Sequence, residues 1–388
     1  MKKVIIFGST GSIGRNALDV IRMSKNNFQV KGLCTYRNIK LLKRQIQEFR
    51  PNYVCVVNEK SAKELKRMIV EPSTKFFFGE SGLKEFSSLT SDIAVMGIAG
   101  IASLFPLFIH IKYTKRIALA SKEPMVVGAK LIKKEAKSNH TEIIPIDSEI
   151  NSLYQTLRFV NRKDIRKVYL TASGGPLFNI RKTLYLKKLK VRDVLRHPTW
   201  RMGRRITIDS ATLVNKGFEV IEAHEFFGIP YDLIDVVIQR ESKVHSFVEL
   251  KDGFSFLCFY FPDMRLPIGY TLYYPERASS LKNISYFKIE NKMILTFYKL
   301  DYTRFPLLRL VLKAATRNDN SLIVINAADE VGIDYFLKGK IDFLSIYKVI
   351  EYIFSEYPSK RVTSLEDIIF WNDWARKKAS EYLEKKCC

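Results

Sequence analysis

Hydrophobic residues in the first part of the chain fall into short runs, and helical segments separate the runs. Apolar runs bounded by turn residues predict buried strands, and they occupy residues 3–7, 28–35, 53–57, 93–97, 116–120 and 142–146. Between them, apolar positions recur at helical spacing, as they do in helices that pack on a sheet. This alternation predicts an α/β fold with a doubly wound parallel sheet.

The later part of the chain has a different pattern. Residues 206–208 alternate like a short strand, and a helix is expected from Asp209 onwards. Residues 236–250 and 253–261 are expected to pair as antiparallel strands through the turn at 251–253. A polar stretch at 278–292 precedes a predicted strand at 293–297. Helices are then expected at 326–336, 347–354 and 365–383.

These patterns suggest boundaries between domains. We expect an N-terminal dinucleotide-binding domain over residues 1–146 and a central α/β catalytic domain over 147–277. A linker over 278–300 and a C-terminal helical bundle over 301–388 would follow.

A glycine-rich turn, GSTGSIG, follows the first strand and leads into a helix. Such a turn presents backbone N–H groups to a pyrophosphate, so the first domain is expected to be Rossmann-like. The second strand ends in Thr35, Tyr36, Arg37 and Asn38, without the acid that holds the ribose of NAD. Arg37 therefore favours the 2′-phosphate of NADP, with a solvated turn residue as the alternative.

Three acids could form a metal site. Asp147 and Glu149 alternate in PIDSEIN, which we interpret as an extended segment. Together with Glu219 they could chelate a hard divalent ion, although an exposed strand end with two unrelated acids is the alternative. Asn215 and Lys216 lie four and three residues before Glu219, which predicts one shared helix face. The alternative here is a surface helix with a solvated ion pair.

The loop at 197–205 contains Trp200, Gly203 and several basic residues. This composition suits a mobile lid over an anionic small molecule, whereas a fixed core role for Trp200 is the alternative. TASGGP at 171–176 suits either a phosphate or a tight bend, and His245 is expected to be structural.

Composition adds few constraints. The net charge of +24 is spread along the chain and suits an anionic substrate and cofactor, while nucleic acid is an alternative partner that we do not expect. Five cysteines lack zinc-ligand spacing and fit a reducing cytoplasm. We expect no signal peptide, and no apolar stretch approaches the roughly 18 residues of a membrane span.

Taken together, ordered motifs along the whole chain closely resemble the 1-deoxy-D-xylulose 5-phosphate reductoisomerase family. They are GSTGSIG, the Arg37–Asn38 turn, LASKE, PIDSE, TASGGP, HPTWRMG, DSATLVNKGFEVIEAHEFF, SKVHSFVE, PDMRLPIGY, YPER and NAADEV. The resemblance implies rearrangement and NADPH-dependent reduction of 1-deoxy-D-xylulose 5-phosphate to 2-C-methyl-D-erythritol 4-phosphate, in non-mevalonate isoprenoid synthesis. It further implies Mg²⁺ or Mn²⁺ as the metal, a phosphorylated substrate and a homodimer without a membrane partner.

The resemblance also implies roles for individual residues. NADPH would contact Thr10, Gly11, Ser12, Ile13, Arg37, Asn38, Ser121, Glu123 and Gly203. The metal would be held by Asp147, Glu149 and Glu219. The substrate would contact Lys122, Ser148, Glu149, Ser173, His197, Ser210, Asn215, Lys216 and Glu219. Catalysis would involve Lys122, Glu149, His197 and Trp200.

Three positions depart from the family's pattern. Ser121 replaces an Asn that contacts the cofactor, Ile150 replaces a His near the metal, and Tyr36 replaces a small residue. We expect weaker binding or a lower rate from these changes, but not loss of the reaction. Two other functions stay open: an NADP-dependent oxidoreductase without the rearrangement, and a basic NADP- or RNA-binding protein with a decayed catalytic site.

Overall fold

The computed structural model describes residues 1–24, 26–68, 73–178, 186–196, 199–200, 203–278, 281–288 and 292–387. Its contacts divide the chain into two compact units. The first unit contains Met1–Pro124, Ile132–Asn151 and Asp263–Ser285. The second unit contains Met125–Leu131, Ser152–Pro262 and Tyr286–Cys388.

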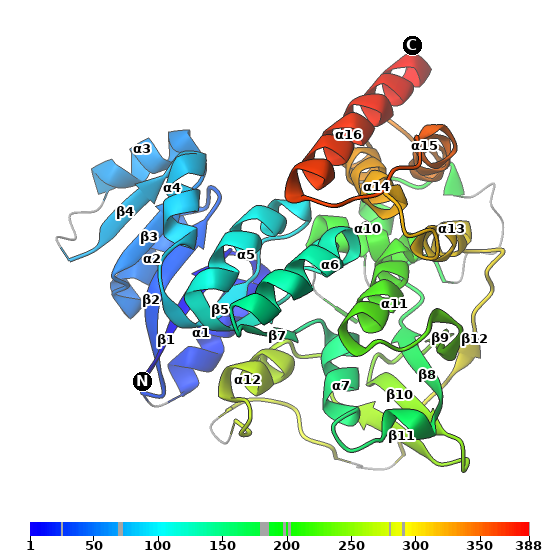
Figure 1. Cartoon of the computed structure of the whole chain (residues 1–388), viewed down its shortest axis with the longest axis horizontal. Coiled ribbons are helices and arrows are strands. Elements are labelled where there is room, and N and C mark those ends of the chain that lie inside the picture. Colours follow the sequence, from blue (N-terminus) through cyan, green and yellow to red (C-terminus); the bar gives the residue numbers. More distant parts are fainter. Residues whose placement is uncertain are drawn as a thin grey trace. The chain divides into compact units, whose positions relative to one another are not determined.

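The first unit is built on a parallel sheet with the strand order β4-β3-β2-β1-β5-β6-β7 (Figure 1). Its strands are β1 (Lys2–Phe7), β2 (Phe28–Thr35), β3 (Tyr53–Val56), β4 (Lys75–Phe78), β5 (Ser91–Met96), β6 (Thr114–Leu119) and β7 (Glu142–Pro145). The order runs in opposite directions on the two sides of β1, so the sheet has its switch point between β1 and β5. Ligands of open α/β sheets bind outside the carboxyl ends of the strands at such a point. The predicted doubly wound fold is confirmed, and β4 is an addition to it.

Helices accompany these strands. They are α1 (Ser12–Met23), α2 (Ile39–Phe49), α3 (Glu59–Met68), α4 (Gly79–Ser87), α5 (Leu104–His110), α6 (Glu123–Ser138) and α12 (Arg265–Tyr273), with 3-10 turns at Ile101–Ser103 and Ile111–Tyr113. Apolar side chains of the central strands, such as Val4, Ile6 and Val95, are fully buried against helix residues such as Leu18 and Leu42. The core therefore lies where the sequence pattern placed it.

The second unit contains a mixed sheet with the strand order β11-β10-β8-β9-β12. Its strands are β8 (Ile165–Ala172), β9 (Ile234–Ile238), β10 (Val244–Leu250), β11 (Ser255–Phe259) and β12 (Tyr298–Lys299). Strands β8 and β9 are parallel, whereas β10 is antiparallel to both β8 and β11. The predicted hairpin at 251–253 is confirmed. The expected strand at 236–250 is wrong as one element, because the chain turns between β9 and β10, with Ser242 at a φ of 49°.

Helices make up the rest of the second unit. They are α9 (Val191–Val194), α10 (Arg204–Thr212), α11 (Val214–Phe227), α13 (Pro306–Ala315), α14 (Ser321–Leu337), α15 (Phe343–Glu356) and α16 (Leu365–Cys387), with 3-10 turns at Arg162–Asp164 and Tyr231–Leu233. Helix α7 (Ser148–Thr156) begins in the first unit and ends in the second. Helix α11 contacts β8 and β9 on one side and α13 on another, and α14 contacts both α15 and α16. The expected helical end is confirmed, with α13 as an addition. The predicted strand at 293–297 is wrong, because the strand described in this part of the chain is β12, which begins only at Tyr298.

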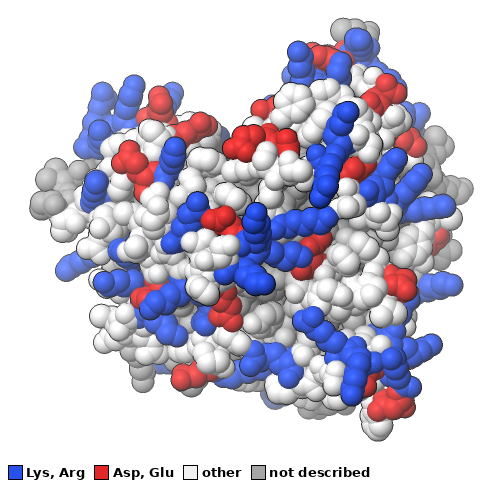
Figure 2. Space-filling model, in the orientation of Figure 1, with Lys and Arg blue, Asp and Glu red and all other residues white. Residues whose placement is uncertain are grey.

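Charged side chains are scattered over the face drawn in Figure 2. On the face drawn in Figure 2, Lys and Arg side chains alternate with acidic and uncharged residues over the described part of the chain. Among the described residues, no helix is long and apolar enough to cross a membrane.

Candidate functional site

The glycine turn after β1 forms a close backbone cradle in the first unit. Gly8 has a φ of 79°, and a Cβ added there would lie 2.6 Å from the Gly97 carbonyl oxygen. A Cβ on Gly14 would lie 2.4 Å from the Gly8 oxygen, so helix α1 approaches the turn as closely as glycine alone permits. Gly11 caps α1 at its N-terminus without a side-chain hydrogen bond. The first N–H groups of the helix therefore suit an anion such as a pyrophosphate.

The ends of β1 and β2 are tied together beside this cradle. The hydroxyls of Thr10 and Thr35 lie 2.5 Å apart, and the Ser9 hydroxyl donates to Gln45 Oε1 at 2.9 Å. Arg37 and Asn38 follow in the exposed turn between β2 and α2. The Asn38 side chain accepts a hydrogen bond from the Leu41 N–H and so caps α2. Arg37 is thereby placed at the carboxyl edge of the sheet, on the same edge as the glycine turn.

The residues that follow β6 include Ser121 and Glu123, which were predicted to contact the cofactor, and Lys122, which was predicted to contact the substrate. The Ser121 hydroxyl donates to the Ser103 hydroxyl at 2.8 Å, and Ser103 donates to the Gly100 carbonyl at 2.7 Å. Ser121 is thus engaged with a neighbouring loop of the protein. The Lys122 ammonium is buried and lies 2.8 Å from Asp147 Oδ2. Glu123 begins helix α6.

The PIDSEIN segment differs from our expectation. It does not continue as an extended strand: helix α7 begins at Ser148, so Glu149 lies in the first helical turn and Asp147 just before it. The backbone N–H of Asn151 already bonds to the Asp147 carbonyl, and its side chain donates to the Pro145 carbonyl at 2.8 Å. These bonds favour the helix over an extended strand. Ser148 donates to the Glu149 carboxylate.

Two features of this segment bear on metal binding. The buried Oδ1 atom of Asp147 has no hydrogen-bond partner among the described residues. A buried carboxylate oxygen without a donor is an expected ligand for a cation. Ile150, which follows Glu149 in helix α7, is fully buried and belongs to the core.

The central stretch of the second unit also corrects our prediction. Residues 206–208 belong to helix α10, which begins at Arg204, and so the expected strand there is wrong. Leu213, with a φ of 60°, ends α10 and starts α11. The alternating Ile206 and Ile208 look like a strand only locally, because Ile208 is fully buried as part of a helix. Arg204 and Arg205, which we expected in the lid, are helical as well.

The predicted polar face of α11 is confirmed. The Asn215 side-chain amide donates to Glu219 Oε1 at 2.5 Å, and the Lys216 ammonium donates to Glu219 Oε2. Side chains of Lys216 and Glu219 are only 3% and 1% exposed. The pair is therefore buried, which excludes the solvated ion pair that was the alternative. Buried partners of opposite charge hold each other in a fixed geometry.

The TASGGP turn packs directly against α10. Gly175 has a φ of 65°, and a Cβ there would lie 2.6 Å from the Ser210 carbonyl oxygen. The Gly175 N–H donates to the Ser173 hydroxyl at 3.1 Å. The two serines predicted for the substrate phosphate, Ser173 and Ser210, therefore stand on neighbouring pieces of backbone.

Arg240 is a residue that our sequence reasoning missed. Its guanidinium donates to the carbonyls of Ser173 and Gly175, at 2.5 and 3.2 Å, and lies 4.7 Å from the centre of the Phe178 ring. Burial lowers the pKa of Arg240 from its ordinary value. A basic residue just after β9 was the available signal, but its partners are more than 60 residues away in the chain.

Part of the expected lid is described. The half-buried Trp200 ring packs edge to face with the His245 ring, with the ring centres 6.0 Å apart, and the hydroxyls of Thr199 and Ser242 share a hydrogen bond at 3.0 Å. His245 stacks on Tyr260 and donates to its carbonyl, in keeping with a structural role. Gly203 caps α10. The predicted site residue His197 lies outside the described residues, as do Pro198, Arg201 and Met202.

Comparison with known proteins covers nearly the whole chain. Family models described as 1-deoxy-D-xylulose 5-phosphate reductoisomerase, its C-terminal domain and the DXP reductoisomerase C-terminal domain match residues 4–129, 143–227 and 260–378. A relative named 1-deoxy-D-xylulose 5-phosphate reductoisomerase from Caldanaerobacter subterraneus is 42% identical over 371 residues, which are 95% of this chain and 96% of the relative.

Solved structures give the same result. The reductoisomerase from Zymomonas mobilis in complex with NADPH aligns with a TM-score of 0.90 and 31% identity, over 99% of each chain. A DOX-P reductoisomerase in complex with NADPH, fosmidomycin and magnesium also aligns with a TM-score of 0.90 and 31% identity, over 99% of this chain and 98% of the other.

Proposed function

The chain belongs to the 1-deoxy-D-xylulose 5-phosphate reductoisomerase family, and we infer that it converts 1-deoxy-D-xylulose 5-phosphate to 2-C-methyl-D-erythritol 4-phosphate with NADPH and a divalent metal ion. The observation that carries this conclusion is the similarity over almost the full length to a named reductoisomerase. The glycine cradle and the carboxylates, among them the buried Oδ1 atom of Asp147, fit the cofactor and the metal of the solved complexes. A decayed enzyme would be expected to lose such groups.

We propose that NADPH binds at the cradle of the first unit. The backbone from Thr10 to Ile13 would hold the pyrophosphate, and Arg37 and Asn38 would hold the 2′-phosphate and its ribose. The proposed contacts are Thr10, Gly11, Ser12, Ile13, Arg37, Asn38, Ser121, Glu123 and Gly203. Support comes from the closeness of the turn to α1, which leaves no room for a side chain at Gly14. The Ser121 hydroxyl donates its hydrogen bond to Ser103, so it would have to give up or share this bond in order to contact the cofactor.

We propose Asp147, Glu149 and Glu219 as the metal ligands, with Mg²⁺ or Mn²⁺ as the ion. All three offer carboxylate oxygens, the ligands that hard divalent ions prefer. Lys122 and Lys216 each bond one of these carboxylates and thereby orient its oxygens. When bound, the ion polarises the oxygens of the substrate and NADPH supplies the hydride.

The substrate would be held mainly by its phosphate. Ser173 and Ser210 stand on adjacent backbone segments of the second unit, and Arg240 fixes the turn that carries Ser173. We propose Ser148, Ser173, His197, Ser210, Asn215 and Lys216 as substrate contacts, together with the ligands Glu149 and Glu219. Lys122, Glu149, His197 and Trp200 would stand closest to the reacting atoms. Trp200 would cover the carbon skeleton and exclude water from it.

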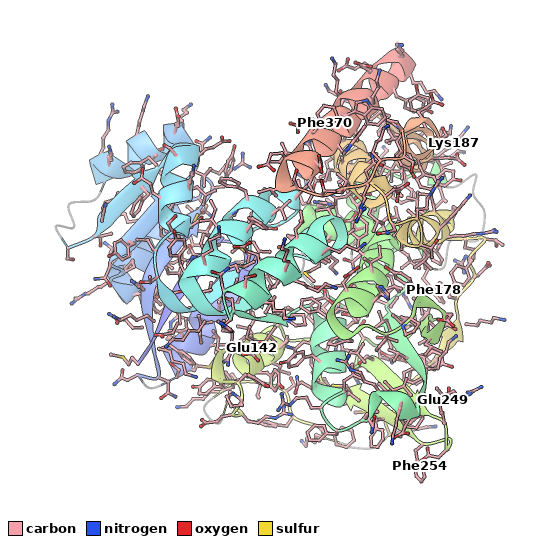
Figure 3. All side chains as sticks on the ribbon, viewed as in Figure 1. Glu142, Phe178, Lys187, Glu249, Phe254 and Phe370 are labelled. Atoms are coloured by element: carbon pink, nitrogen blue, oxygen red, sulfur yellow. The ribbon has the colours of Figure 1, made fainter. Side chains whose placement is uncertain are left out.

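A homodimer in the cytoplasm completes the proposal. One face of the mixed sheet carries Tyr169 and Phe247, whose rings stack at 4.3 Å. Leu257 lies opposite Phe247 on the neighbouring strand and is 47% exposed. Phe297 is 43% exposed, and the centre of its ring lies 5.8 Å from that of Phe247. Exposed aromatic and aliphatic side chains of this kind suit a second copy of the chain. Figure 3 shows Phe254 projecting from the adjoining hairpin, near Glu249 of the same strand pair.

The dimer has its own test. Leu257→Arg should give a monomer by light scattering, because a charge would be buried without a partner. A wild-type protein that is already monomeric would overturn this part of the proposal.

Oxidation of NADPH by the purified protein tests the proposed activity. We expect oxidation only when 1-deoxy-D-xylulose 5-phosphate and Mg²⁺ are both present, and loss of activity on chelation of the metal. Oxidation that proceeds equally well after chelation would contradict the proposed role of the metal.

A further inference from the structure

A second buried polar cluster joins α10 to the C-terminal helices, apart from the carboxylates proposed as metal ligands. It contains Arg205 and Asp209 of α10, Asn326, Asp329 and Glu330 of α14, and Arg376 of α16. Asp209 is 5% exposed, and Asp329 and Asn326 are completely buried. Buried acids are rare unless they are paired, so this cluster requires an explanation.

Arg205 is the centre of the cluster. Its guanidinium donates to Glu330 at 2.6 Å and to Asn326 Oδ1 at 3.1 Å. The same group lies 3.6 Å from Asp209 and 3.7 Å from Asp329. Arg376 donates to the second oxygen of Glu330 at 2.6 Å, which adds α16 to the same network. Three helices that are far apart in the sequence are therefore joined at one point.

Among the described residues, two guanidinium groups face the three carboxyl groups of Asp209, Asp329 and Glu330. These charges balance when one of the three acids is protonated. Burial, and then the neighbouring charge of Asp209, raise the pKa of Asp329 well above its ordinary value. Both carboxylate oxygens of Asp329 are buried without a hydrogen-bond partner among the described residues, so a proton shared with Asp209 would neutralise the cluster and let one carboxyl group donate to the other.

Asp209 immediately precedes Ser210, and the Ser210 carbonyl lies against the TASGGP turn. Helix α10 has only nine residues, from Arg204 to Thr212. A shift of Asp209 would therefore move Ser210 relative to Ser173.

We propose that Asp329 is a positioning residue for the reaction, which holds Asp209 and thereby fixes α10 so that Ser210 meets the substrate phosphate. The proposal rests on the proposed function, because the role of Ser210 is an expectation from the family. It assigns a part in substrate binding to the helical end of the chain.

Steady-state kinetics of full-length variants test this assignment. Asp329→Leu removes both hydrogen bonding and charge at similar size. We expect KM for 1-deoxy-D-xylulose 5-phosphate to rise about tenfold, while NADPH affinity is retained. Asp329→Asn should restore a KM close to that of the wild type, because the amide can donate to Asp209 as the protonated acid does. The exposed Asp334 of the same helix serves as a control, since Asp334→Asn should change neither constant.

The pH dependence gives a second readout, which remains if the leucine variant does not fold. As the pH rises, the shared proton leaves and two adjacent carboxylates repel, so the wild-type KM should rise more steeply than that of Asp329→Asn. Stability should follow the same direction. The pKa of Asp329 is raised in the folded chain. The stabilisation that protonated Asp329 adds to the free energy of unfolding is therefore fully present below the unfolded-state pKa, and it is lost as the pH rises through the folded-state pKa. The unfolding free energy of the wild type should therefore fall with pH relative to that of the asparagine variant.

Two results would overturn the proposal: a folded Asp329→Leu protein with an unchanged KM, or wild-type and Asp329→Asn profiles of KM against pH that superimpose. A wild-type protein that does not turn over the substrate would instead count against the proposed function. In that case only the unfolding measurements would test the role of Asp329. If the free energy of unfolding depended on pH equally in the wild type and in Asp329→Asn, the shared proton would be rejected.

Discussion

The glycine turn after β1 and the α10–α11 helix pair both present polar groups suited to anions, but they are built differently. The turn is shaped within the first 100 residues: its contacts come from residues 8–14, from the neighbouring strand ends at Cys34, Thr35 and Gly97, and from Gln45 of α2. The helix pair depends on distant parts of the chain, because Gly175 packs under Ser210 and Arg205 is held by Glu330. A local site can be perturbed alone, whereas changes far away in the sequence should disturb the second one.

The largest expected effect concerns Glu219 of the helix pair. Glu219→Gln removes a proposed ligand and the negative charge with which the buried Lys216 pairs. Turnover should fall by at least about a hundredfold, as for loss of a group on which the metal depends, while NADPH binding in the other unit should be retained. NADPH titration of the inactive variant measures this difference. Near-normal turnover at saturating Mg²⁺ would remove Glu219 from the site.

Gly14→Ala tests the local site. The new methyl group would lie 2.4 Å from the Gly8 carbonyl, so the turn must move. We expect about 1–3 kcal/mol of lost stability and a clear loss of NADPH affinity, while the helix pair is undisturbed. Calorimetric titration and thermal unfolding measure the two effects. Gly203→Ala is the matched comparison for stability, because no atom of the described residues lies within 4 Å of a Cβ at that position. Unchanged cofactor affinity in Gly14→Ala would show that the cradle does not bind the pyrophosphate.

Arg37 sharpens the description of the same local site. Arg37→Ala should narrow the preference for NADPH over NADH by about 1–3 kcal/mol, as expected for a lost charge-assisted contact. The ratio of kcat/KM for the two cofactors measures it, with the exposed Arg15 of helix α1 as a control site. If the variant discriminates as well as the wild type, another residue contacts the 2′-phosphate.

The smallest expected effect is a change in the fluorescence of Trp200. It would report closure of the loop at 197–205 over the site at the α10–α11 helix pair. Its ring lies beside His245 and is half-buried, so both the lid and the fixed-core interpretation stay open. Substrate or a phosphonate-hydroxamate analogue, added with metal, should change tryptophan fluorescence in the wild type but not in Trp200→Phe. Equal hydrogen-exchange protection of residues 197–205 with and without ligand would favour the fixed core.

The same contrast explains which features could be predicted from the sequence. Strands β1, β2, β3, β5, β6 and β7 were predicted because short apolar runs report directly on burial. The shared face of Asn215, Lys216 and Glu219 was predicted because helical spacing is local. Residues 206–208 were assigned wrongly, because the alternation of Ile206 and Ile208 is also compatible with a helix that has one fully buried side.

Other features required tertiary contacts. The position of Arg240 just after a strand does not identify its partners, because the carbonyls of Ser173 and Gly175 that it holds lie 67 and 65 residues away in the chain. The start of α7 at Ser148 was missed because it depends on the bonds that Asn151 makes to Pro145 and Asp147. Strand β4 was missed because the run at 75–78 is short and follows a charged helix. The boundaries of the domains stay a prediction.

Product analysis with carbon-labelled substrate tests the central claim most directly, because it separates the reductoisomerase from a reductase that leaves the carbon skeleton unchanged. The purified protein would be incubated with 1-deoxy-D-xylulose 5-phosphate, NADPH and Mg²⁺, and the product examined by carbon NMR. We predict the branched skeleton of 2-C-methyl-D-erythritol 4-phosphate, formed in equal amount to the NADPH consumed. An unbranched alcohol formed with the same consumption of NADPH would contradict the account.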